Sequence, residues 1–395
     1  MGKKLRYIIL VFLTLVIFRP ARAQNDFGRT DSLTYSQYLN GDWDNLIRTG
    51  KEVLARGVDY KFLRQRIGYA YYCKADYIRS RRQYSKALRF DSFDPNSLEY
   101  LYKSYLFSGN SDGAAVIAGK MHPGMRNSLS ISLFKPVESV DAEFNFKFAG
   151  TKLRSNPVYY HLGLSSRLGS RVSLYQMFSN YYQTITVRYP AGDRHIRDLQ
   201  PEYYALLKVS VTPWLYLKSA WHYLRTSNTG VSVTTTSSDL FYGSVSADLA
   251  GFTIEADASV LNSGNNLTKQ FGGSIGLKSP GNRGLYMASS LAAIDDGSTT
   301  RAVFSQRAGF RFTGKVWLEG NVTFGNLTDY RELSAMYIYN TLDPTSFRCG
   351  SSIYFFSGKR LDLWGNISYE RKDFYENILY HYNQFSYTGG IRWKL

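Results

Sequence analysis

The chain ends with Tyr387-Thr-Gly-Gly-Ile-Arg-Trp-Lys-Leu395, in which apolar and polar side chains alternate up to the terminus. Successive side chains of a strand point to opposite sides of the sheet, so this pattern predicts a strand with one apolar and one polar face. Such a strand suits a closed barrel with lipid outside and water inside, which satisfies its backbone groups within hydrocarbon. The terminus therefore predicts a β-barrel in the outer membrane of a Gram-negative bacterium.

The same alternation recurs from Val140 onward, in segments of about ten residues separated by Gly, Pro, Asn or Asp. It predicts an antiparallel transmembrane barrel over residues 138–395, preceded by a linker over 126–137. Short turns and longer polar connections alternate along this region and indicate about fourteen strands. The alternative is sixteen strands, if Ser128–Phe134 also pairs.

The amino terminus resembles a secretory signal peptide. Lys3, Lys4 and Arg6 precede the apolar run Tyr7–Phe18, and Ala21-Arg22-Ala23 supplies a small-x-small cleavage site. The apolar run is too short to span a bilayer. Residues 1–23 are therefore predicted to be removed, which leaves a mature chain that begins at Gln24.

Between Arg29 and Met121 the sequence repeats with a period of about 34 residues, the spacing of tetratricopeptide helix pairs. Four registers carry the repeat: Gly41, Ala75 and Gly109; Asp42, Asp76 and Asn110; Leu46, Ser80 and Ala114; and Val53, Ala87 and Met121. The small residues allow close approach of paired helices, and larger ones fill the grooves between them. The pattern predicts an α-solenoid of three tetratricopeptide-like repeats over residues 24–125, located in the periplasm.

The middle repeat is rich in lysine and arginine. A solvated helix surface is one interpretation, and docking of an acidic glycan or an acidic protein segment is the other. The residues proposed for such binding are Arg64, Lys74, Arg79, Arg81, Arg82 and Lys86. The whole chain carries a formal charge of +17, which favours anionic partners but equally fits contact with lipid phosphates. Nucleic acid is not expected as a partner in the periplasm.

The longest connection within the predicted barrel is Gly325–Ser346, which is rich in charged and aromatic residues. Treating it as one loop keeps the strand number even. Long loops are disproportionately functional, and two arrangements are open. The loop either folds into the lumen as a plug or gate, or forms an ordered external lid. As a plug it would place charges across the pore, at Asp329, Arg331, Glu332 and Asp343.

The polar face of the predicted strands carries charges of both signs, as the interior of a barrel of this size does by default. The candidates for lumen-lining cations are Arg307, Arg311 and Arg392. Basic residues modestly outnumber acidic ones on this inferred face. The excess favours an acidic or neutral passenger over a cationic one.

No motif in the chain indicates an enzyme, a metal site or a cofactor. The sequence contains neither a Gly-x-Ser-x-Gly elbow nor a His-Glu-x-x-His helix, and its five histidines are scattered. Cys73 and Cys349 fall in different predicted domains, so a disulfide is not expected. Cys73 is predicted to be a small buried residue.

The order of signal peptide, helical repeats and barrel resembles the YaiO-type outer-membrane β-barrel family with tetratricopeptide repeats. The likeness is carried by the ending from Gly390 to Leu395 and by Tyr337-Ile-Tyr-Asn340 through Asp343. The terminal strand is also similar to the signal read by the barrel-assembly machinery, which is thereby implied as a partner alongside outer-membrane lipid. The architecture is similar to exopolysaccharide exporters as well. These resemblances imply assistance in the export or surface exposure of a polysaccharide.

The alternative function is a membrane-anchored scaffold. In that hypothesis the barrel is closed, and the repeats bind a periplasmic protein of a secretion or envelope assembly.

Overall fold

The computed structural model describes residues 20–188, 190, 192–230, 233–264, 266–279, 284–340, 343–358, 360–376 and 378–395. Side chains are described for all of these residues except 20–26, 374–376 and 378–379. The predicted signal peptide lies outside the described residues, apart from its last positions, where the first helix begins. The chain divides into two compact units, one ending at Gly109 and the other beginning at Asn110.

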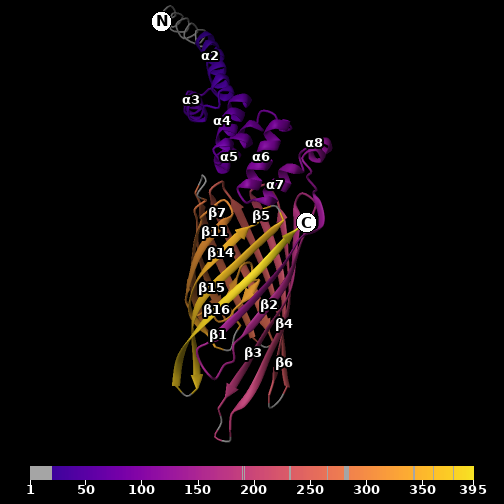
Figure 1. The fold of residues 1–395 in the computed structure, drawn as a ribbon, viewed down its shortest axis with the longest axis vertical. Coiled ribbons are helices and arrows are strands. Elements are labelled where there is room, and N and C mark those ends of the chain that lie inside the picture. The colour runs from indigo at the N-terminus through magenta and orange to yellow at the C-terminus, as the bar shows by residue number, and fades with distance from the viewer. Residues whose placement is uncertain are drawn as a thin grey trace, which may run out of the picture. The chain divides into compact units, whose positions relative to one another are not determined.

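The amino-terminal unit consists of helices, drawn in indigo and purple in Figure 1. They are α2 (Pro20–Leu39), α3 (Trp43–Ala55), α4 (Lys61–Cys73), α5 (Tyr77–Ala87) and α6 (Pro95–Phe107). None of the helices in the described ranges is long and apolar enough to cross a bilayer. Cys73 is exposed at the end of α4, so the expectation that it is buried was wrong.

The repeat registers mark how α3, α5 and α7 (Ser111–Ala118) begin. Two residues before each helix the backbone is left-handed, with φ angles of 67°, 54° and 78° at Gly41, Ala75 and Gly109. One residue before each helix a polar side chain accepts a hydrogen bond from a backbone N–H of the first turn, at Asp42, Asp76 and Asn110. These two registers are therefore a repeated turn and helix cap, and not the close approach of paired helices that was expected of the small residues.

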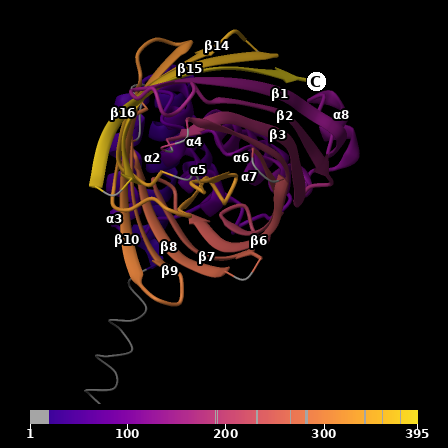
Figure 2. The same ribbon diagram turned by 90° about the horizontal axis from the view of Figure 1, so that it is seen from below.

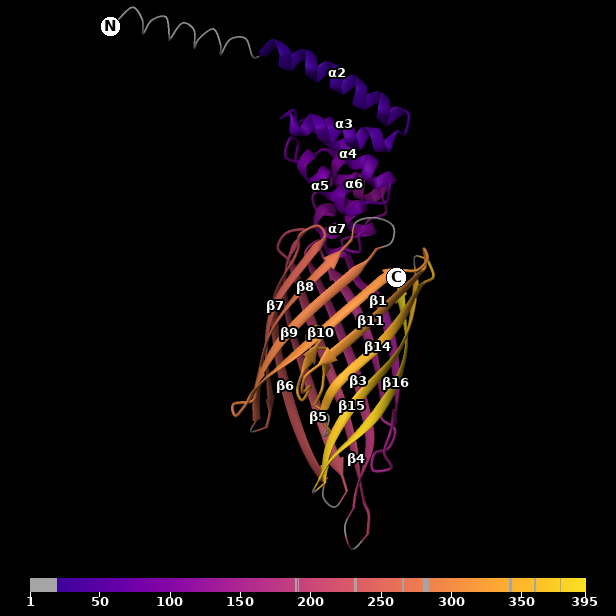
Figure 3. The ribbon, with the colours of Figure 1, turned by 90° about the vertical axis from the view of Figure 1, so that its left-hand side faces the viewer.

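The carboxyl-terminal unit begins with α7 and α8 (Pro123–Ser128) and continues as a closed antiparallel barrel of fourteen strands (Figures 1 and 3). The strands are β1 (Phe134–Ala149), β2 (Val158–Leu168), β3 (Val172–Val187), β4 (Arg194–Ser210), β5 (Leu215–Thr229), β6 (Val233–Asp248), β7 (Phe252–Ser263), β8 (Asn266–Lys278), β9 (Tyr286–Asp295), β10 (Thr300–Arg311), β11 (Val316–Phe324), β14 (Thr345–Phe356), β15 (Leu361–Glu376) and β16 (Ile378–Lys394). Each strand pairs with its neighbour in sequence, and β1 pairs with β16 to close the barrel.

The predicted count of fourteen is confirmed, and the alternative of sixteen is wrong, because Ser128 ends α8 and β1 begins only at Phe134. This start lies before the expected boundary at residue 138. Several predicted long connections are themselves strands. For example, the polar residues Thr226–Ser237 are predicted from sequence to be one of the longer connections, but β5 and β6 stay paired through them as far as Thr229 and Val233.

The two faces of the strands differ as the alternation requires. On β1, Phe144 is 52% exposed on the outside, whereas its near neighbour Asp141 is 5% exposed on the inside. On β16, Ile391 and Trp393 face outward. The inner face is polar, with buried serine, glutamine, histidine and charged side chains from most strands. The barrel thus has an apolar outer wall and a polar lumen.

Candidate functional site: the barrel lumen and its inserted loop

Between β11 and β14 the chain leaves the wall and enters the lumen as residues 325–340 and 343–344, which we name the inserted loop. Viewed along the barrel axis, Figure 2 shows this segment in orange and gold inside the ring of strands. Its middle forms a small hairpin of β12 (Arg331–Glu332) and β13 (Tyr337–Ile338). Of the two arrangements that the sequence leaves open, the structure therefore has the loop in the lumen.

The tip of the inserted loop has a strained backbone. Leu333, Ser334 and Ala335 have successive positive φ angles of 53°, 60° and 64°. A left-handed conformation costs a residue with a side chain roughly 1–2 kcal/mol. Such strain persists only where the surroundings impose it, and it is typical of clamps and switches.

Two wall residues hold this tip. The Tyr204 hydroxyl donates a hydrogen bond of 2.8 Å to the Ser334 carbonyl oxygen. His222, which is fully buried, contacts the Ala335 carbonyl oxygen through Nδ1 at 2.9 Å and the Glu202 carboxylate through Nε2 at 3.2 Å. The buried imidazole therefore bridges the carbonyl oxygen of the tip and the Glu202 carboxylate.

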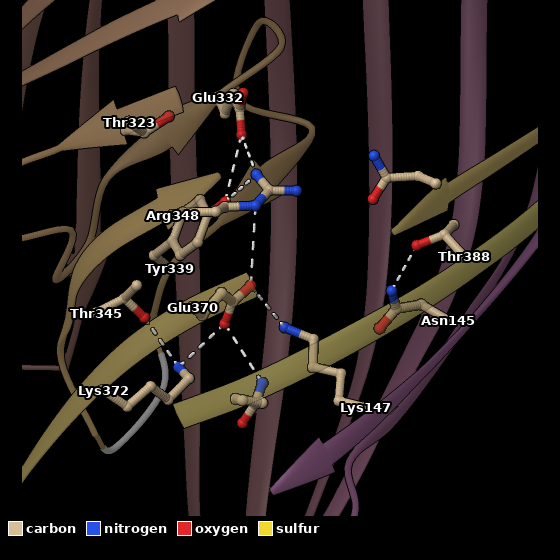
Figure 4. A network of polar contacts seen from close by, with 12 residues as sticks. Asn145, Lys147, Thr323, Glu332, Tyr339, Thr345, Arg348, Glu370, Lys372 and Thr388 are labelled. Atoms are coloured by element: carbon tan, nitrogen blue, oxygen red, sulfur yellow. Dashed lines mark hydrogen bonds and ion pairs between the residues drawn. The ribbon is translucent and has the colours of Figure 1, made fainter. Parts of the chain in front are cut away.

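A charged cluster anchors the side of the loop, shown in Figure 4. Arg348 of β14 contacts Glu332 of the loop at 3.0 Å and lies 3.9 Å from Glu370 of β15. It also donates to the hydroxyl of Tyr339. Glu370 has further cationic neighbours, because Lys147 and Lys372 lie 3.3 Å and 3.7 Å from it. Among the described residues, Arg348 is the only lysine or arginine within ion-pair distance of Glu332.

The other charged residues predicted on the loop also contact the wall. Arg331 is buried, and its guanidinium donates to the Thr268 carbonyl oxygen at 2.9 Å. Asp343 receives two hydrogen bonds from Arg154, at 2.7 Å and 2.8 Å. Asp329 lies 3.5 Å from the Thr268 hydroxyl. The four predicted residues thus hold the loop against the barrel wall.

Apolar contacts complete the seat of the loop. Ala335 packs in a cluster of inward-facing residues contributed by strands β3 to β7, with Met336 and Ile338 against it. Nearer the start of the loop, Leu327 and Tyr330 pack against residues of β9 and β10. The inserted loop is therefore a folded plug.

Beside the plug lies a cavity of about 580 Å³, which we name the lumen cavity. Eight carboxylate side chains line it, against five lysine and arginine side chains. The predicted basic excess is therefore wrong for this cavity, whose lining carries three more negative than positive charges. Of the predicted lumen cations, Arg307 and Arg392 line the cavity, whereas Arg311 does not and is exposed near the end of β10.

At the end of the barrel with the short turns, α7 is tied to the wall. Asp112 lies 3.1 Å from Arg167 of β2 and 2.5 Å from Lys208 of β4. Asn110 donates hydrogen bonds to Tyr216 and Asp248. Burial alone would raise the pKa of the Asp112 carboxyl, but the charges of Lys208 and Arg167 outweigh burial and hold that pKa below its ordinary value.

The docking of α7 against the barrel wall should therefore weaken at acid pH. A carboxyl with a depressed folded pKa contributes stability above its unfolded pKa of about 3.9, and that stability is lost as pH falls through the folded pKa. We expect the α7 amides to be protected from hydrogen exchange at pH 7 and to lose protection below about pH 4. Asp112→Asn should lose much of this protection already at pH 7. Asp44→Asn, which removes an exposed carboxylate elsewhere, is the control, and equal α7 protection in Asp112→Asn and native protein would contradict the assignment.

The predicted basic residues of the helical unit do not form one surface. Arg64 and Arg81 are buried: Arg64 pairs with Asp59 at 2.6 Å, and Arg81 stacks on the Tyr105 ring. Two others are exposed but have acidic partners, Lys74 with Asp44 and Arg79 with Asp76. The last two are exposed as well, namely Arg82 and Lys86. The predicted binding surface is thus reduced to its four exposed members.

Sequence reasoning missed the residues that hold the plug tip and α7, namely Tyr204, His222, Glu202 and Asp112. Each is a single polar residue without a motif, so only its place in the fold reveals its partner. Among the described residues, no cluster of histidine, cysteine, aspartate and glutamate has the geometry of a metal site.

Neither a protein-family model nor a curated protein matches this sequence, so membership of the YaiO-type family stays a prediction. Solved structures resemble the barrel at low identity. The Ralstonia pickettii toluene transporter TbuX is 9% identical, with a TM-score of 0.48, covering 72% of this chain and 94% of its own. The Pseudomonas putida toluene transporter TodX is 9% identical, with a TM-score of 0.45 and coverages of 71% and 92%. A bacterial polysaccharide outer membrane secretin is 8% identical, with a TM-score of 0.38 and coverages of 66% and 99%. Similarity at this level indicates no function.

Proposed function

We propose that this protein is a gated β-barrel of the bacterial outer membrane that passes a glycan, with its helical unit in the periplasm. The apolar outer wall supports membrane insertion, because outward side chains such as Phe144 and Ile391 would otherwise be exposed to water. The polar lumen supports a hydrophilic passenger, since hydroxyl groups can exchange hydrogen bonds with its wall.

The observation that carries the gate is the strained tip of the plug. Three left-handed residues in succession are held by contacts to Tyr204 and His222, so release of the tip relieves strain while those contacts are lost. The two effects oppose each other, which is what a two-state element requires. A permanently closed barrel would have no need of a strained plug.

The helical unit would recruit an acidic partner on the periplasmic side, rather than the passenger itself. Helix pairs at the tetratricopeptide spacing commonly present binding surfaces, and the exposed cations Lys74, Arg79, Arg82 and Lys86 lie on this unit. An acidic protein segment fits such residues. This assignment rests on charge and spacing.

The scaffold remains the second candidate, and one observation favours it. The lumen is occupied both by the plug and by its apolar seat of Met177, Leu224 and Leu240, so much of the bore is packed as a core. A barrel closed in this way would serve to anchor the helical unit.

Planar-bilayer recordings of the full-length native protein distinguish the two functions. A gated conduit should be closed for most of the time and should open briefly as the voltage rises, and a neutral malto-oligosaccharide should interrupt the open current. Lipid without protein is the control. Absence of any opening, at voltages that the bilayer survives, would refute the conduit and support the scaffold.

A further inference from the structure

The lumen cavity has negative charge that the wall does not neutralise. Its carboxylates include Glu143, Asp198 and Glu319, for which no lysine or arginine of the described residues lies within 4.0 Å. Most of its cations are already engaged. Lys147, Arg348 and Lys372 surround Glu370, and Arg392 lies 3.6 Å from Asp141.

Buried polar atoms that lack a hydrogen-bond partner in the protein are concentrated among the residues that line the cavity. Half of the fourteen such atoms in the described chain belong to residues that line it. Among them are carboxylate oxygens of Asp141 and Asp198 and amide oxygens of Asn145 and Asn321. These oxygens accept hydrogen bonds and cannot donate them, and an unsatisfied buried acceptor is costly. The cavity therefore favours an occupant that brings several donors.

Aromatic rings line the same space. Tyr159, Tyr175, Tyr337 and Trp364 contribute to its wall. Several of these rings are oriented by the carboxylates, because Tyr337 and Trp364 both donate to Glu143, at 2.9 Å and 2.8 Å. Aromatic faces attract cations and also pack against the apolar faces of ring-shaped ligands.

We propose that the lumen cavity binds a cationic, hydroxyl-rich glycan segment, such as an oligomer of an unacetylated amino sugar. The inference rests on the proposed passage of a glycan and specifies the charge of that glycan. Hydroxyl groups satisfy the orphaned acceptors, and ammonium groups neutralise Asp198 and Glu319. A cavity of this volume is in the usual range for small-ligand sites. An acidic glycan is excluded by repulsion from the same carboxylates.

The test is equilibrium binding to the detergent-solubilised full-length protein, followed through tryptophan fluorescence and calorimetry. The probes are three oligomers of equal length, made of glucosamine, N-acetylglucosamine and galacturonate. We expect the glucosamine oligomer to bind tightest and the galacturonate oligomer weakest. Asp198→Asn and Glu319→Gln should each weaken glucosamine-oligomer binding by about three- to tenfold while changing N-acetylglucosamine-oligomer binding little. Asp193→Asn, in the exposed connection before β4, is the matched control and should bind like the native protein.

Equal binding of the glucosamine and galacturonate oligomers, or no loss in both cavity variants, would overturn the proposal. A second measurement covers the case in which the plug obstructs entry of every oligomer. Without residues 326–340, the barrel should prefer cations in a salt gradient, and the two cavity substitutions should move its reversal potential toward zero. An anion-selective barrel would overturn the proposal too. Binding of an oligomer in the lumen cavity does not require conduction. A native barrel that never opens would therefore refute the proposed conduit, whereas the binding measurements alone decide whether the cavity prefers a cationic glycan.

Discussion

Replacing residues 326–340 by a short glycine–serine linker should convert a mostly closed barrel into a permanently open one. A fourteen-stranded barrel is wide enough to leave interior space, and the plug with its apolar contacts fills that space. We expect single-channel conductance to rise by roughly an order of magnitude, with the brief openings of the native protein replaced by a steady current.

The control is an equivalent replacement at a connection that does not enter the lumen. The turn 296–299 between β9 and β10 serves, because Asp296 bonds mainly within the turn itself. Folding of each variant is checked by circular dichroism and by the heat-dependent shift of the barrel on gels. A variant that lacks the plug, is fully folded and is still as closed as native protein would show that α7 or another element closes the bore.

Arg348→Met should release the plug while leaving the barrel folded. Removal of the guanidinium leaves the Glu332 side chain, which is only 17% exposed, without its cation, whereas Glu370 keeps Lys147 and Lys372. Breaking a buried ion pair in this way costs about 3–5 kcal/mol. Since about 1.4 kcal/mol corresponds to a tenfold change in an equilibrium constant, the equilibrium constant for docking of the plug should fall by at least roughly a hundredfold.

The docking equilibrium is measured by the maleimide labelling rate of a cysteine introduced as Met336→Cys, with Cys73 and Cys349 changed to serine. Arg348→Met should accelerate labelling strongly. Adding Glu332→Gln should restore most of the protection of the cysteine from labelling, because the unpaired negative charge is then absent. Leu333→Gly should slow labelling, since glycine relieves the left-handed strain at the tip. Arg360→Met, an exposed arginine on the short-turn side, is the control, and native labelling rates in Arg348→Met would refute the anchor.

Much of the fold could be predicted because its signals are local. Alternation with a period of two residues identifies a half-buried strand wherever it occurs, and turn residues at fixed positions limit the number of strands. The helix caps at Asp42, Asp76 and Asn110 were visible as a repeat for the same reason. Strand ends were predicted less well, because hairpins such as β5–β6 continue into polar sequence that resembles a loop.

The site was only partly predictable. The loop residues Arg331, Glu332 and Asp343 were identified from length and composition alone. Their partners Thr268, Arg348 and Arg154 could not be identified. Thr268 of β8 and Arg154 of the β1–β2 connection are far away in sequence, and no spacing rule pairs Arg348 of β14 with Glu332. In the helical unit, Arg64 and Arg81 were misjudged for a different reason: a basic residue type does not reveal that its side chain is buried, as Arg64 is beside Asp59.

By itself, the sequence determined the strand pattern, the closed barrel of fourteen strands and the capped helices, since each depends on the spacing of residue types along the chain. Only the tertiary structure decided that the long loop enters the lumen and that the cavity beside it is acidic. The reason is physical: an inward charge acquires its environment from strands that closure brings around it. The sign and pairing of such charges are therefore properties of the assembled wall.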